Sequence, residues 1–358
     1  MVKMLSSKEL GQVKKILIMQ YKPFGDVLLN TGYLPALRAK FPNAQIDFLV
    51  QKPYKTLLEH NPNLDNLVIM DRINMHTFKY AISRFYMIKR IRKEKYDVII
   101  DQARGPGASQ MTFFSGAKFR LGWLKTKKLS WLKGYNWVYN FKTIMNNEIY
   151  SARTKFEMLR PLGIEEVPHN TFYHILPESK AKAKAWLTDA DLLGKKIVVF
   201  SPVTPVHPRQ WKFEYFARTA DILIDKFGLT VVLLWGPREK EKIEGMASLM
   251  TNKPFIAPAT TFNEAGALLQ HASVYIGNNG GVHHLAVAVK TPTLTVFGPT
   301  TDPLKWTAWD QPIHSFVRNY DRKEYIDGTF GVTPEMVCEK FVELDRVIAQ
   351  INGKNDKN

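Results

Sequence analysis

The fold is decided by residues 15–30, which read KILIMQYKPFGDVLLN. The apolar run Ile16–Met19 has the length and composition of a buried strand. A short loop follows it, and from Val27 to Lys40 the apolar residues recur at the spacing of one helix face. Phe41-Pro42-Asn43 ends this predicted helix, because proline cannot continue it. Strand, loop and helix in this order are typical of the start of a βαβ unit.

The alternation of strands and helices continues through the chain in two halves. It predicts the α/β class with two Rossmann-like domains facing one another across a cleft. We expect an N-terminal domain at 1–178, a second domain at 179–330, and a helix with a tail at 331–358 that could pack back on the first domain. The predicted strands are 16–19, 46–50, 67–70 and 98–100, then 197–200, 230–234, 255–256, 274–276 and 293–297, and the helices of the second half are 214–226, 239–250, 264–270 and 282–289.

Positive charge is concentrated in the first half of the chain. The 358 residues carry a formal net charge of +17. Residues 1–178 hold 28 basic and 14 acidic side chains, a net of +14, whereas residues 179–358 hold 22 and 19, a net of +3. The first half is therefore expected to meet an anionic partner, for which nucleic acid, anionic lipid and a phosphorylated substrate all qualify.

The chain has neither the composition of a disordered protein nor that of a disulfide-rich one. Its longest apolar runs are far shorter than the ~18 residues that span a bilayer. Residues 1–11 are polar and lack the apolar part of a signal peptide, so we expect a cytoplasmic protein. The single cysteine, Cys338, excludes an internal disulfide.

The loop after the first strand, Gln20 to Asp26, is a candidate catalytic site. Parallel sheets bind ligands where their strands end, and Gly25 permits close approach to the backbone. Asp26 is either an N-cap or a carboxylate free to accept a proton from a substrate hydroxyl. The loop has no G-x-G-x-x-G, and the chain has no Walker A motif, which disfavours a P-loop ATPase.

Three loops that follow strands of the second half are candidates for binding an anion. Arg209 ends a proline-rich loop and offers a planar fork to phosphate oxygens, although an exposed arginine is the plainer reading. Asn279-Gly280-Gly281 opens a helix whose free N–H groups favour an anion. Thr300 and Thr301 follow the next strand and either extend that site or form a turn. Trp211 is expected to be a packing residue.

Other motifs are weaker. His283 and His284 are adjacent, are expected to point in different directions, and have no acidic or cysteine partner at ligand spacing, so no metal site is predicted. Asp189-Ala190-Asp191 resembles a D-x-D metal motif but lies in a charged stretch and is interpreted as surface. Residues 78–95 form a basic, amphipathic helix that fits either a membrane surface or, more commonly, a core-facing apolar side with a solvated basic side.

The loops taken in order resemble glycosyltransferase family 9, the heptosyltransferases of lipopolysaccharide core synthesis. The similarity runs from about residue 14 to 310. The residues that carry it are Lys15–Ile18, Gly25–Leu29, Leu34–Arg38, Pro42–Val50, Tyr96–Asp101, Arg120–Gly122, Arg209–Trp211, Trp235–Pro237, Ile276–Asn279, His284–Ala286, Thr291–Thr293 and Phe297–Thr300.

The resemblance implies a GT-B fold and metal-independent, inverting transfer from ADP-L-glycero-D-manno-heptose to the phosphorylated lipid A core, with no cofactor. It implies a peripheral protein at the inner membrane, with the donor on the second domain and the acceptor on the first. Asp26 matches the family's catalytic base and Arg209 its pyrophosphate-binding residue. Glu241, or its rival Glu239, matches the ribose-binding residue. The remaining expected ligands are Asn279, Gly280, Gly281, Thr300 and Thr301 for the donor, and Lys22, Gly25 and Arg104 for the acceptor.

One position departs from the family pattern. The family usually has Asp where this chain has Asn279, and Ser or Thr where it has Gly280. Asn retains the ability to cap a helix and to accept a hydrogen bond, but it loses a negative charge and gains a donor. The departure bears on which donor sugar is used.

Three alternatives remain open. A GT-B transferase could use another nucleotide sugar, and a sugar-nucleotide 2-epimerase of the same architecture would act on the donor without an acceptor. A nucleic-acid-binding protein would fit the charge, but it would leave the strand-end loops unexplained and has no recognisable binding motif. No nucleic acid is therefore expected as a partner.

Overall fold

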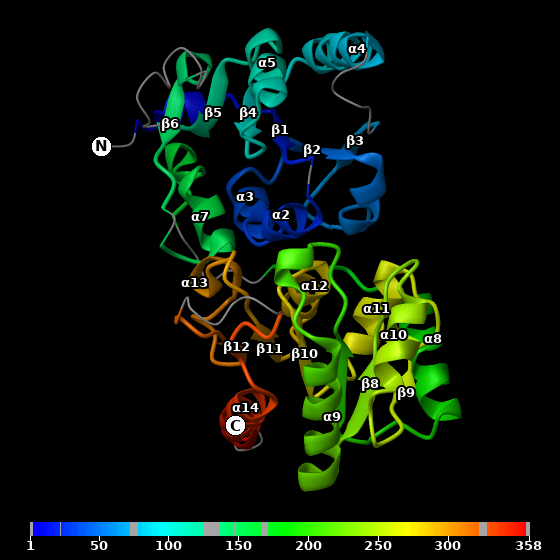
Figure 1. Ribbon diagram of the computed structural model, residues 1–358. Helices are drawn as coiled ribbons and strands as arrows, with labels where there is room; N and C mark the ends of the chain where they lie inside the picture. The colour runs from blue at the N-terminus through cyan, green and yellow to red at the C-terminus, as the bar shows by residue number, and fades with distance from the viewer. Residues whose placement is uncertain are drawn as a thin grey trace. The chain divides into compact units, whose positions relative to one another are not determined.

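The computed structural model divides the chain into two compact units, residues 1–173 and 174–358. The described residues are 3–21, 23–71, 78–124, 136–146, 148–165, 171–321 and 328–355. Figure 1 shows a sheet flanked by helices in each unit. The boundary precedes the predicted division at 178, which falls inside α8 (Pro177–Asp189). This helix packs on α11 (Phe262–Leu269) and so belongs wholly to the second unit.

The first unit contains a parallel sheet with the strand order β3-β2-β1-β4-β5-β6 within the described residues. Its central strands are buried on both faces, which explains why they read as continuous apolar runs. The predicted strands are present, and two further ones, β5 and β6, extend the sheet. The strands are β1 (Lys15–Met19), β2 (Gln45–Gln51), β3 (Asn66–Met70), β4 (Val98–Asp101), β5 (Phe119–Trp123) and β6 (Phe141–Thr143).

The single helix predicted over 27–40 is wrong. The structure has two helices there, α2 (Phe24–Leu29) and α3 (Leu34–Lys40). Asn30 ends α2, and its side-chain Nδ2 donates to the Asp26 carbonyl oxygen at 2.7 Å. The Tyr33 hydroxyl donates to Asn30 Oδ1 at 2.8 Å, which fixes the turn between the two helices. Both helices bury apolar residues, which is why their joint pattern looked continuous.

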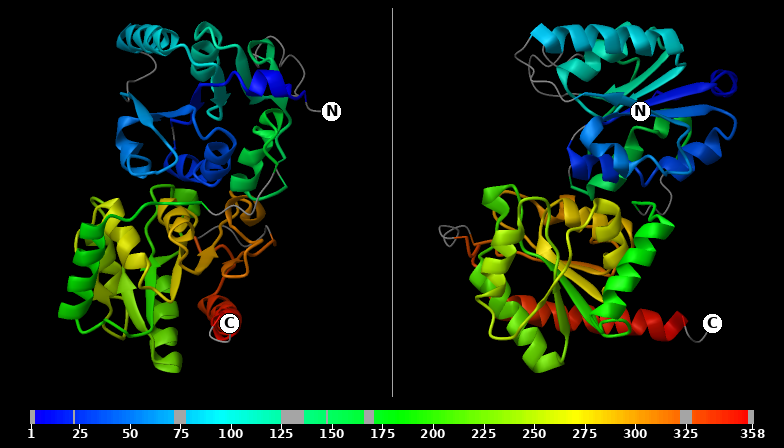
Figure 2. Two further views of the ribbon diagram at one scale, coloured as in Figure 1. Left: turned by 180° about the vertical axis from the view of Figure 1, so that it is seen from behind. Right: turned by 90° about the vertical axis from the view of Figure 1, so that its right-hand side faces the viewer.

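The other helices of the first unit surround its sheet, and Figure 2 shows them from two further sides. Helix α4 packs on α5. The bounds are α1 (Ser7–Leu10), α4 (Phe78–Glu94), α5 (Pro106–Phe114) and α7 (Ser151–Glu157), with 3-10 turns η1 (Lys52–Leu57), η2 (Asn136–Val138) and η3 (Arg160–Leu162).

The second unit contains a second parallel sheet, ordered β12-β11-β10-β7-β8-β9 within the described residues. Its five predicted strands are present, and β12 at the edge was not predicted. The strands are β7 (Ile197–Ser201), β8 (Thr230–Leu233), β9 (Phe255–Ile256), β10 (Val274–Asn278), β11 (Thr293–Val296) and β12 (His314–Val317). The remaining helices are α9 (Phe213–Phe227), α10 (Lys240–Ala247), α12 (Gly281–Ala288), α13 (Pro303–Trp306) and α14 (Pro334–Asn355), with the 3-10 turn η4 (His207–Arg209).

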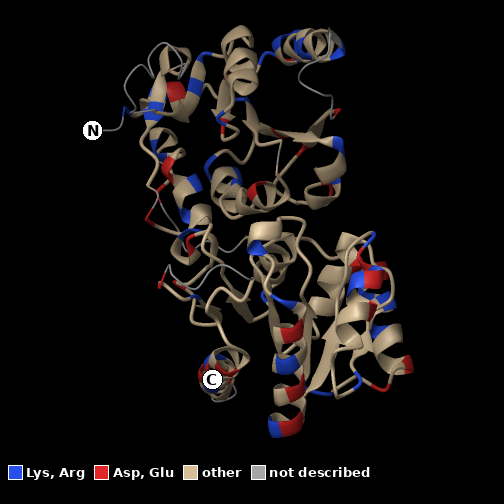
Figure 3. Cartoon of the chain, in the orientation of Figure 1, with Lys and Arg blue, Asp and Glu red and all other residues tan. Residues whose placement is uncertain are grey.

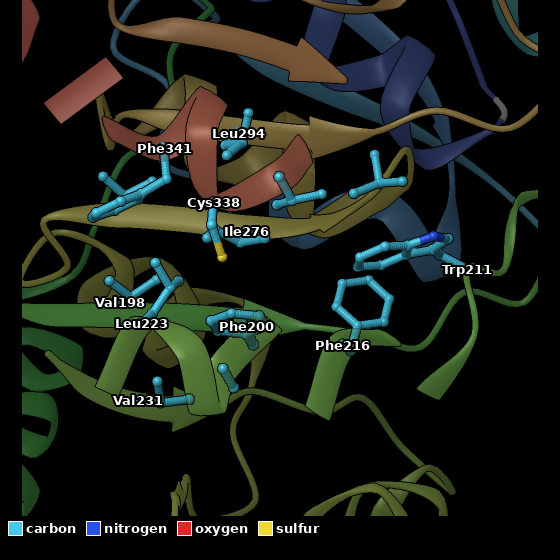
Figure 4. Close-up of a cluster of buried hydrophobic side chains, with 14 of the residues drawn as sticks. Val198, Phe200, Trp211, Phe216, Leu223, Val231, Ile276, Leu294, Cys338 and Phe341 are labelled. Atoms are coloured by element: carbon cyan, nitrogen blue, oxygen red, sulfur yellow. The ribbon is translucent and has the colours of Figure 1, made fainter. Parts of the chain in front are cut away.

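One face of this second sheet forms a large apolar core (Figure 4). Alternate strand residues such as Val198 and Phe200 point into it, as the two-residue period of a strand requires. Helices α9, α10 and α14 cover this face, and α14 contributes Cys338 and Phe341. Helix α14 contacts α9, β11 and β12, so the C-terminal helix packs in the second unit. Among the described residues, no helix is long and apolar enough to cross a membrane.

Candidate active site

The carboxyl ends of the strands bring the candidate residues of each unit together. In the first sheet, Met19 at the end of β1 lies beside Asp101 at the end of β4. In the second sheet, Gly277 near the end of β10 lies beside Ser201 of β7, and Asn278 lies beside Val296 of β11. The loops that follow these strands therefore leave the same edge of their sheet, where parallel α/β folds place their ligands.

Asp26 lies in the first turn of α2 and forms an ion pair. Pro23 is the N-cap of this helix, so Asp26 is not an N-cap. Its Oδ1 lies 3.3 Å from Nζ of Lys155 in α7. The two side chains are 16% and 5% exposed, which leaves the carboxylate partly accessible and the ammonium group buried. A partly exposed carboxylate held by one fixed cation can still accept a proton from a substrate hydroxyl.

Lys155 is held in place from the neighbouring strand end. Gln102, which follows β4, donates from Nε2 to the Lys155 carbonyl oxygen at 3.1 Å. Sequence analysis did not single out Lys155. It lies 129 residues from Asp26, in a helix with no motif, and nothing in the sequence pattern shows that the two meet.

The loop after β4 positions Arg104. The buried Asp101 carboxylate accepts hydrogen bonds from the Ala103 and Arg104 N–H groups at 2.9 and 3.2 Å, and from the Tyr139 hydroxyl at 2.5 Å. These bonds hold Arg104 in a left-handed conformation with φ of 58°, which is uncommon for a residue with a β-carbon. Burial, together with the negative charge of Asp101, raises the pKa of Tyr139, so its hydroxyl remains a donor. The Arg104 side chain is exposed at the strand end.

The two other predicted acceptor residues are less informative. Gly25 lies inside the first turn of α2, not in the loop before it. Lys22 lies outside the described residues.

Arg209 is half-buried at the end of η4 in the loop after β7. Its Nε is buried and has no hydrogen-bond partner among the described residues. Burial lowers the pKa of this guanidinium, yet an arginine stays charged in proteins. A buried, charged donor without a partner is costly unless a ligand supplies the acceptor, and an anionic oxygen is the strongest acceptor available.

The loop that carries Arg209 is fixed by side chains on both sides of it. Gln210 donates to the Pro202 and Trp211 carbonyl oxygens at 2.6 and 2.7 Å. Asn278, at the end of β10, accepts from the Trp211 N–H at 2.9 Å and donates to the Pro202 carbonyl oxygen at 2.6 Å. The fully buried Trp211 packs on Phe216 with ring centroids 4.8 Å apart, which confirms its packing role.

The loop after β10 brings free backbone donors to the same edge. Gly280, not Asn279, is the N-cap of α12, so the expectation that Asn279 caps this helix is wrong. The first N–H groups of α12, beginning with Gly281, have no partners within the helix. The Asn279 side chain is buried, and its Nδ2 has no hydrogen-bond partner within the described ranges. Position 277, near the end of β10, requires glycine, because a β-carbon there would lie 2.7 Å from the Ser201 carbonyl oxygen.

The loop after β11 is the third candidate loop at the carboxyl edge of the second sheet. A β-carbon on Gly298 would lie 3.0 Å from the Pro208 carbonyl oxygen, so the loops after β7 and β11 touch. Thr301 is buried, and its Oγ1 finds no partner in the described part of the chain. Thr300 is exposed. Arg209, Asn279 and Thr301 thus each present a buried donor without a partner at one sheet edge.

The two glutamates after β8 differ in their surroundings. Glu239 is the N-cap residue of α10, and its Oε2 accepts from the Gly236 N–H at 2.7 Å. Glu241 lies in the first turn of the helix and is exposed. Glu239 is therefore engaged by its own turn, whereas Glu241 is accessible to a ligand.

The expectation that His283 and His284 point in different directions is wrong. The rings of His283 and His284 stack with centroids 5.1 Å apart, and His283 also stacks on Tyr275. Burial, followed by the charge of His284, lowers the pKa of His283 well below its ordinary value, so the ring is neutral. Among the described residues, no group of three or more His, Cys, Asp and Glu is placed to hold a metal ion. Asp191 of the D-x-D sequence forms an exposed ion pair with Lys195 at 2.7 Å, in agreement with its interpretation as surface.

Solved structures of a similar fold include glycosyltransferases. A glycosyltransferase family 9 structure from Veillonella parvula superposes with a TM-score of 0.77 at 20% identity and covers 93% of this chain and 97% of that chain. The ADP-heptose lipopolysaccharide heptosyltransferase II of Escherichia coli superposes with a TM-score of 0.71 at 18% identity and covers 94% and 99%. The fold is therefore the GT-B type.

Sequence relatives place the chain more narrowly. Residues 84–327 match the family described as glycosyltransferase family 9 (heptosyltransferase). Lipopolysaccharide heptosyltransferase 3 of Escherichia coli is 28% identical over 307 residues, which cover 83% of this chain and 86% of that protein. The chain belongs to glycosyltransferase family 9.

Proposed function

We propose that this glycosyltransferase moves heptose from ADP-L-glycero-D-manno-heptose to the phosphorylated inner core of lipopolysaccharide, with inversion and without a metal. Family membership supports the reaction. Two observations support the assignment of roles: the Asp26 carboxylate is paired with Lys155, and Arg209, Asn279 and Thr301 bury donors that have no partner among the described residues. The enzyme would act as a peripheral protein at the inner face of the cytoplasmic membrane, where a lipid-borne acceptor is available.

In this proposal Asp26 is the general base. Its carboxylate takes the proton of the acceptor hydroxyl while that oxygen attacks the anomeric carbon of heptose. The new C–O bond forms as the bond to ADP breaks on the opposite face, which inverts the configuration. General-base assistance of this kind contributes about 10²–10⁴ to the rate. Lys155 acts through Asp26 by holding its carboxylate at 3.3 Å, and is thus a positioning residue.

The second unit would bind ADP and stabilise it as the leaving group. Negative charge grows on the pyrophosphate as the bond breaks, and fixed donors stabilise that charge most when they need no reorganisation. Arg209, the Asn279 side chain, the Gly280–Gly281 amides and the Thr300 and Thr301 hydroxyls are assigned to the pyrophosphate and the sugar. Glu241 is assigned to the ribose, because Glu239 is already hydrogen-bonded to its own turn.

The first unit would hold the acceptor through Lys22, Gly25 and Arg104. The net charge of +14 on residues 1–178 fits a phosphorylated substrate. Arg104 is exposed on a turn fixed by Asp101, so its guanidinium can reach a phosphate without the backbone having to reorder.

The proposal is tested by incubating the enzyme with ADP-heptose, with and without a core acceptor that lacks this heptose, and following both substrates by mass spectrometry. Transfer is expected only when both are present. A change in the donor without acceptor would instead indicate an epimerase.

The identity of the donor is tested by repeating the assay with UDP- and GDP-sugars and by measuring the melting temperature of the enzyme with each nucleotide sugar. A ligand that binds only the native state raises the melting temperature of the protein. Stabilisation by UDP- or GDP-sugars but not by ADP-heptose would overturn the donor assignment.

A further inference from the structure

Helix α4 exposes large apolar side chains on one side. Arg84, Met87 and Ile91 are buried on its inner side, where α4 packs on α5. On the opposite side Phe85 and Tyr86 are 62% and 65% exposed. Ile82 is also exposed and shares their face, because residues three and four apart in a helix are neighbours. Of the two interpretations of this helix, a core-facing apolar side therefore does not account for Ile82 and Phe85.

The same helix continues into an exposed basic segment. Lys89, Arg90, Arg92 and Lys93 are all exposed in its last two turns. The one acidic residue of α4, Glu94, forms an ion pair with Lys15 at 3.2 Å and so does not offset this charge. Figure 3 shows the basic residues along α4. An apolar half and a cationic half thus lie on one exposed helix side.

A second group of exposed aromatic side chains adjoins the basic end. Phe113 and Phe114 at the end of α5 and Trp137 in η2 are all exposed. The Phe113 ring lies 5.1 Å from that of Phe114 and 4.9 Å from that of Trp137. Arg92 Nη1 donates to the Phe114 carbonyl oxygen at 3.3 Å, which joins this group to α4. Figure 1 and Figure 2 show α4 and α5 at the same end of the first unit.

We propose that this surface, the α4–α5 face, binds the surface of an anionic lipid bilayer. It consists of Ile82, Phe85, Tyr86, Phe113, Phe114 and Trp137 with the basic residues 89, 90, 92 and 93. Aromatic and aliphatic side chains enter the headgroup boundary, and lysines and arginines pair with lipid phosphates. A protein partner fits less well, because lysine is depleted at the centre of protein interfaces. The inference rests on the proposed function, in which the acceptor is held in a membrane.

The test is flotation of the full chain with vesicles of phosphatidylethanolamine and phosphatidylglycerol, compared with phosphatidylcholine vesicles. Wild type is expected to float with the anionic vesicles alone and to be released at high salt. A Phe85→Ser/Tyr86→Ser variant and a Lys89→Gln/Arg90→Gln/Lys93→Gln variant should each lower the partition coefficient about tenfold or more. Matched controls on other exposed surfaces, Leu249→Ser and Lys180→Gln/Lys184→Gln, should bind like wild type.

Activity separates this inference from the proposed function. Transfer to a water-soluble, deacylated core acceptor should be unchanged in the α4 variants, whereas transfer to acceptor embedded in anionic vesicles should fall with their vesicle binding. Equal melting temperatures show that the variants are folded. Vesicle binding that survives either α4 variant, or a wild type that does not bind, would overturn the assignment, as would self-association through this face in size-exclusion chromatography. Absence of transfer to the soluble acceptor by wild type would instead contradict the proposed function.

Discussion

At the carboxyl edge of the first sheet, the carboxylates of Asp26 and Asp101 have partners within the protein. At the corresponding edge of the second sheet, Arg209, Asn279 and Thr301 each bury a donor with no hydrogen-bond partner among the described residues. Buried polar groups are normally satisfied, so unsatisfied donors that gather at one strand edge indicate a place for a ligand. The first edge also buries donors without a partner among the described residues, Trp123 Nε1 and Thr143 Oγ1 at the ends of β5 and β6. The two edges therefore differ in charge: the first carries a carboxylate held by a cation, and the second carries a guanidinium whose Nε has no partner there.

The largest effect is expected at the ion pair of the first edge. Lys155→Met would leave Asp26 without its cation, and breaking a largely buried pair costs about 3–5 kcal/mol of the free energy of unfolding. We expect a large drop in stability by urea unfolding, and a lower kcat with little change in the acceptor KM. The double variant Asp26→Asn/Lys155→Met should recover much of the stability but not the activity. A single variant as stable as wild type would show that the pair does not form.

The second edge is tested by removing its cation. Arg209→Ala should weaken ADP binding by about 10–100-fold, as expected for the loss of a charge-assisted hydrogen bond worth about 1.5–3 kcal/mol. Isothermal titration calorimetry measures this, and stability should change little, since the lost donor had no partner in the protein. Arg218→Ala, which removes an exposed arginine paired with Glu335, is the control. Unchanged ADP affinity in Arg209→Ala would remove this residue from the donor site.

A smaller change is expected when the family's usual residue is restored. Asn279→Asp replaces a buried donor by a negative charge near the proposed pyrophosphate, so ADP affinity should fall by roughly 3–10-fold, in the range of one net hydrogen bond. Comparing ADP with ADP-heptose by calorimetry shows whether the sugar offsets the loss. A tighter ADP complex in Asn279→Asp would contradict the position assigned to this side chain.

A gradual effect, spread over several pH units, concerns stability in the second unit. Burial lowers the pKa of His314 to about 4, from an ordinary value near 6.5. The unfolded chain therefore binds a proton that the folded chain does not, and stability falls as the pH drops from about 6.5 towards 4, by at most ~1.4 kcal/mol per pH unit. His314→Gln should flatten this dependence in urea unfolding between pH 7.5 and 5. An identical pH dependence in both proteins would show that His314 does not contribute.

The sequence predicted the positions of the candidate residues relative to the strands. Asp26 and Arg209 could be located because each follows a short apolar strand, and parallel strands gather their ends at one edge. The break between α2 and α3 was missed because both helices bury one face, and Asn30 gave no breaker signal as strong as proline. Strand β12 was missed because His314–Val317 is short and mixed in polarity.

Contacts between distant segments could not be predicted. The Asp26–Lys155 pair joins α2 to α7, and only the folded sheet brings these helices together. The exposure of Phe85 could not be predicted either, because it depends on which face of α4 packs on the rest of the unit. The helical period of the apolar residues does not specify that face. The sequence pattern therefore located the strand ends, while tertiary packing decided which side chains there are held by partners and which are accessible.

The most direct test of whether the catalytic base and the donor site lie at separate sheet edges is one variant with two measurements. Asp26→Asn keeps the shape of the side chain and removes its charge, so donor affinity by calorimetry should stay within about twofold while the transfer rate falls about 10²–10⁴-fold. Asp189→Asn, an exposed carboxylate at the end of α8, should leave both unchanged. An Asp26→Asn enzyme that retained most of its transfer rate, or that lost donor affinity in proportion to it, would contradict the assignment of base and donor to separate edges.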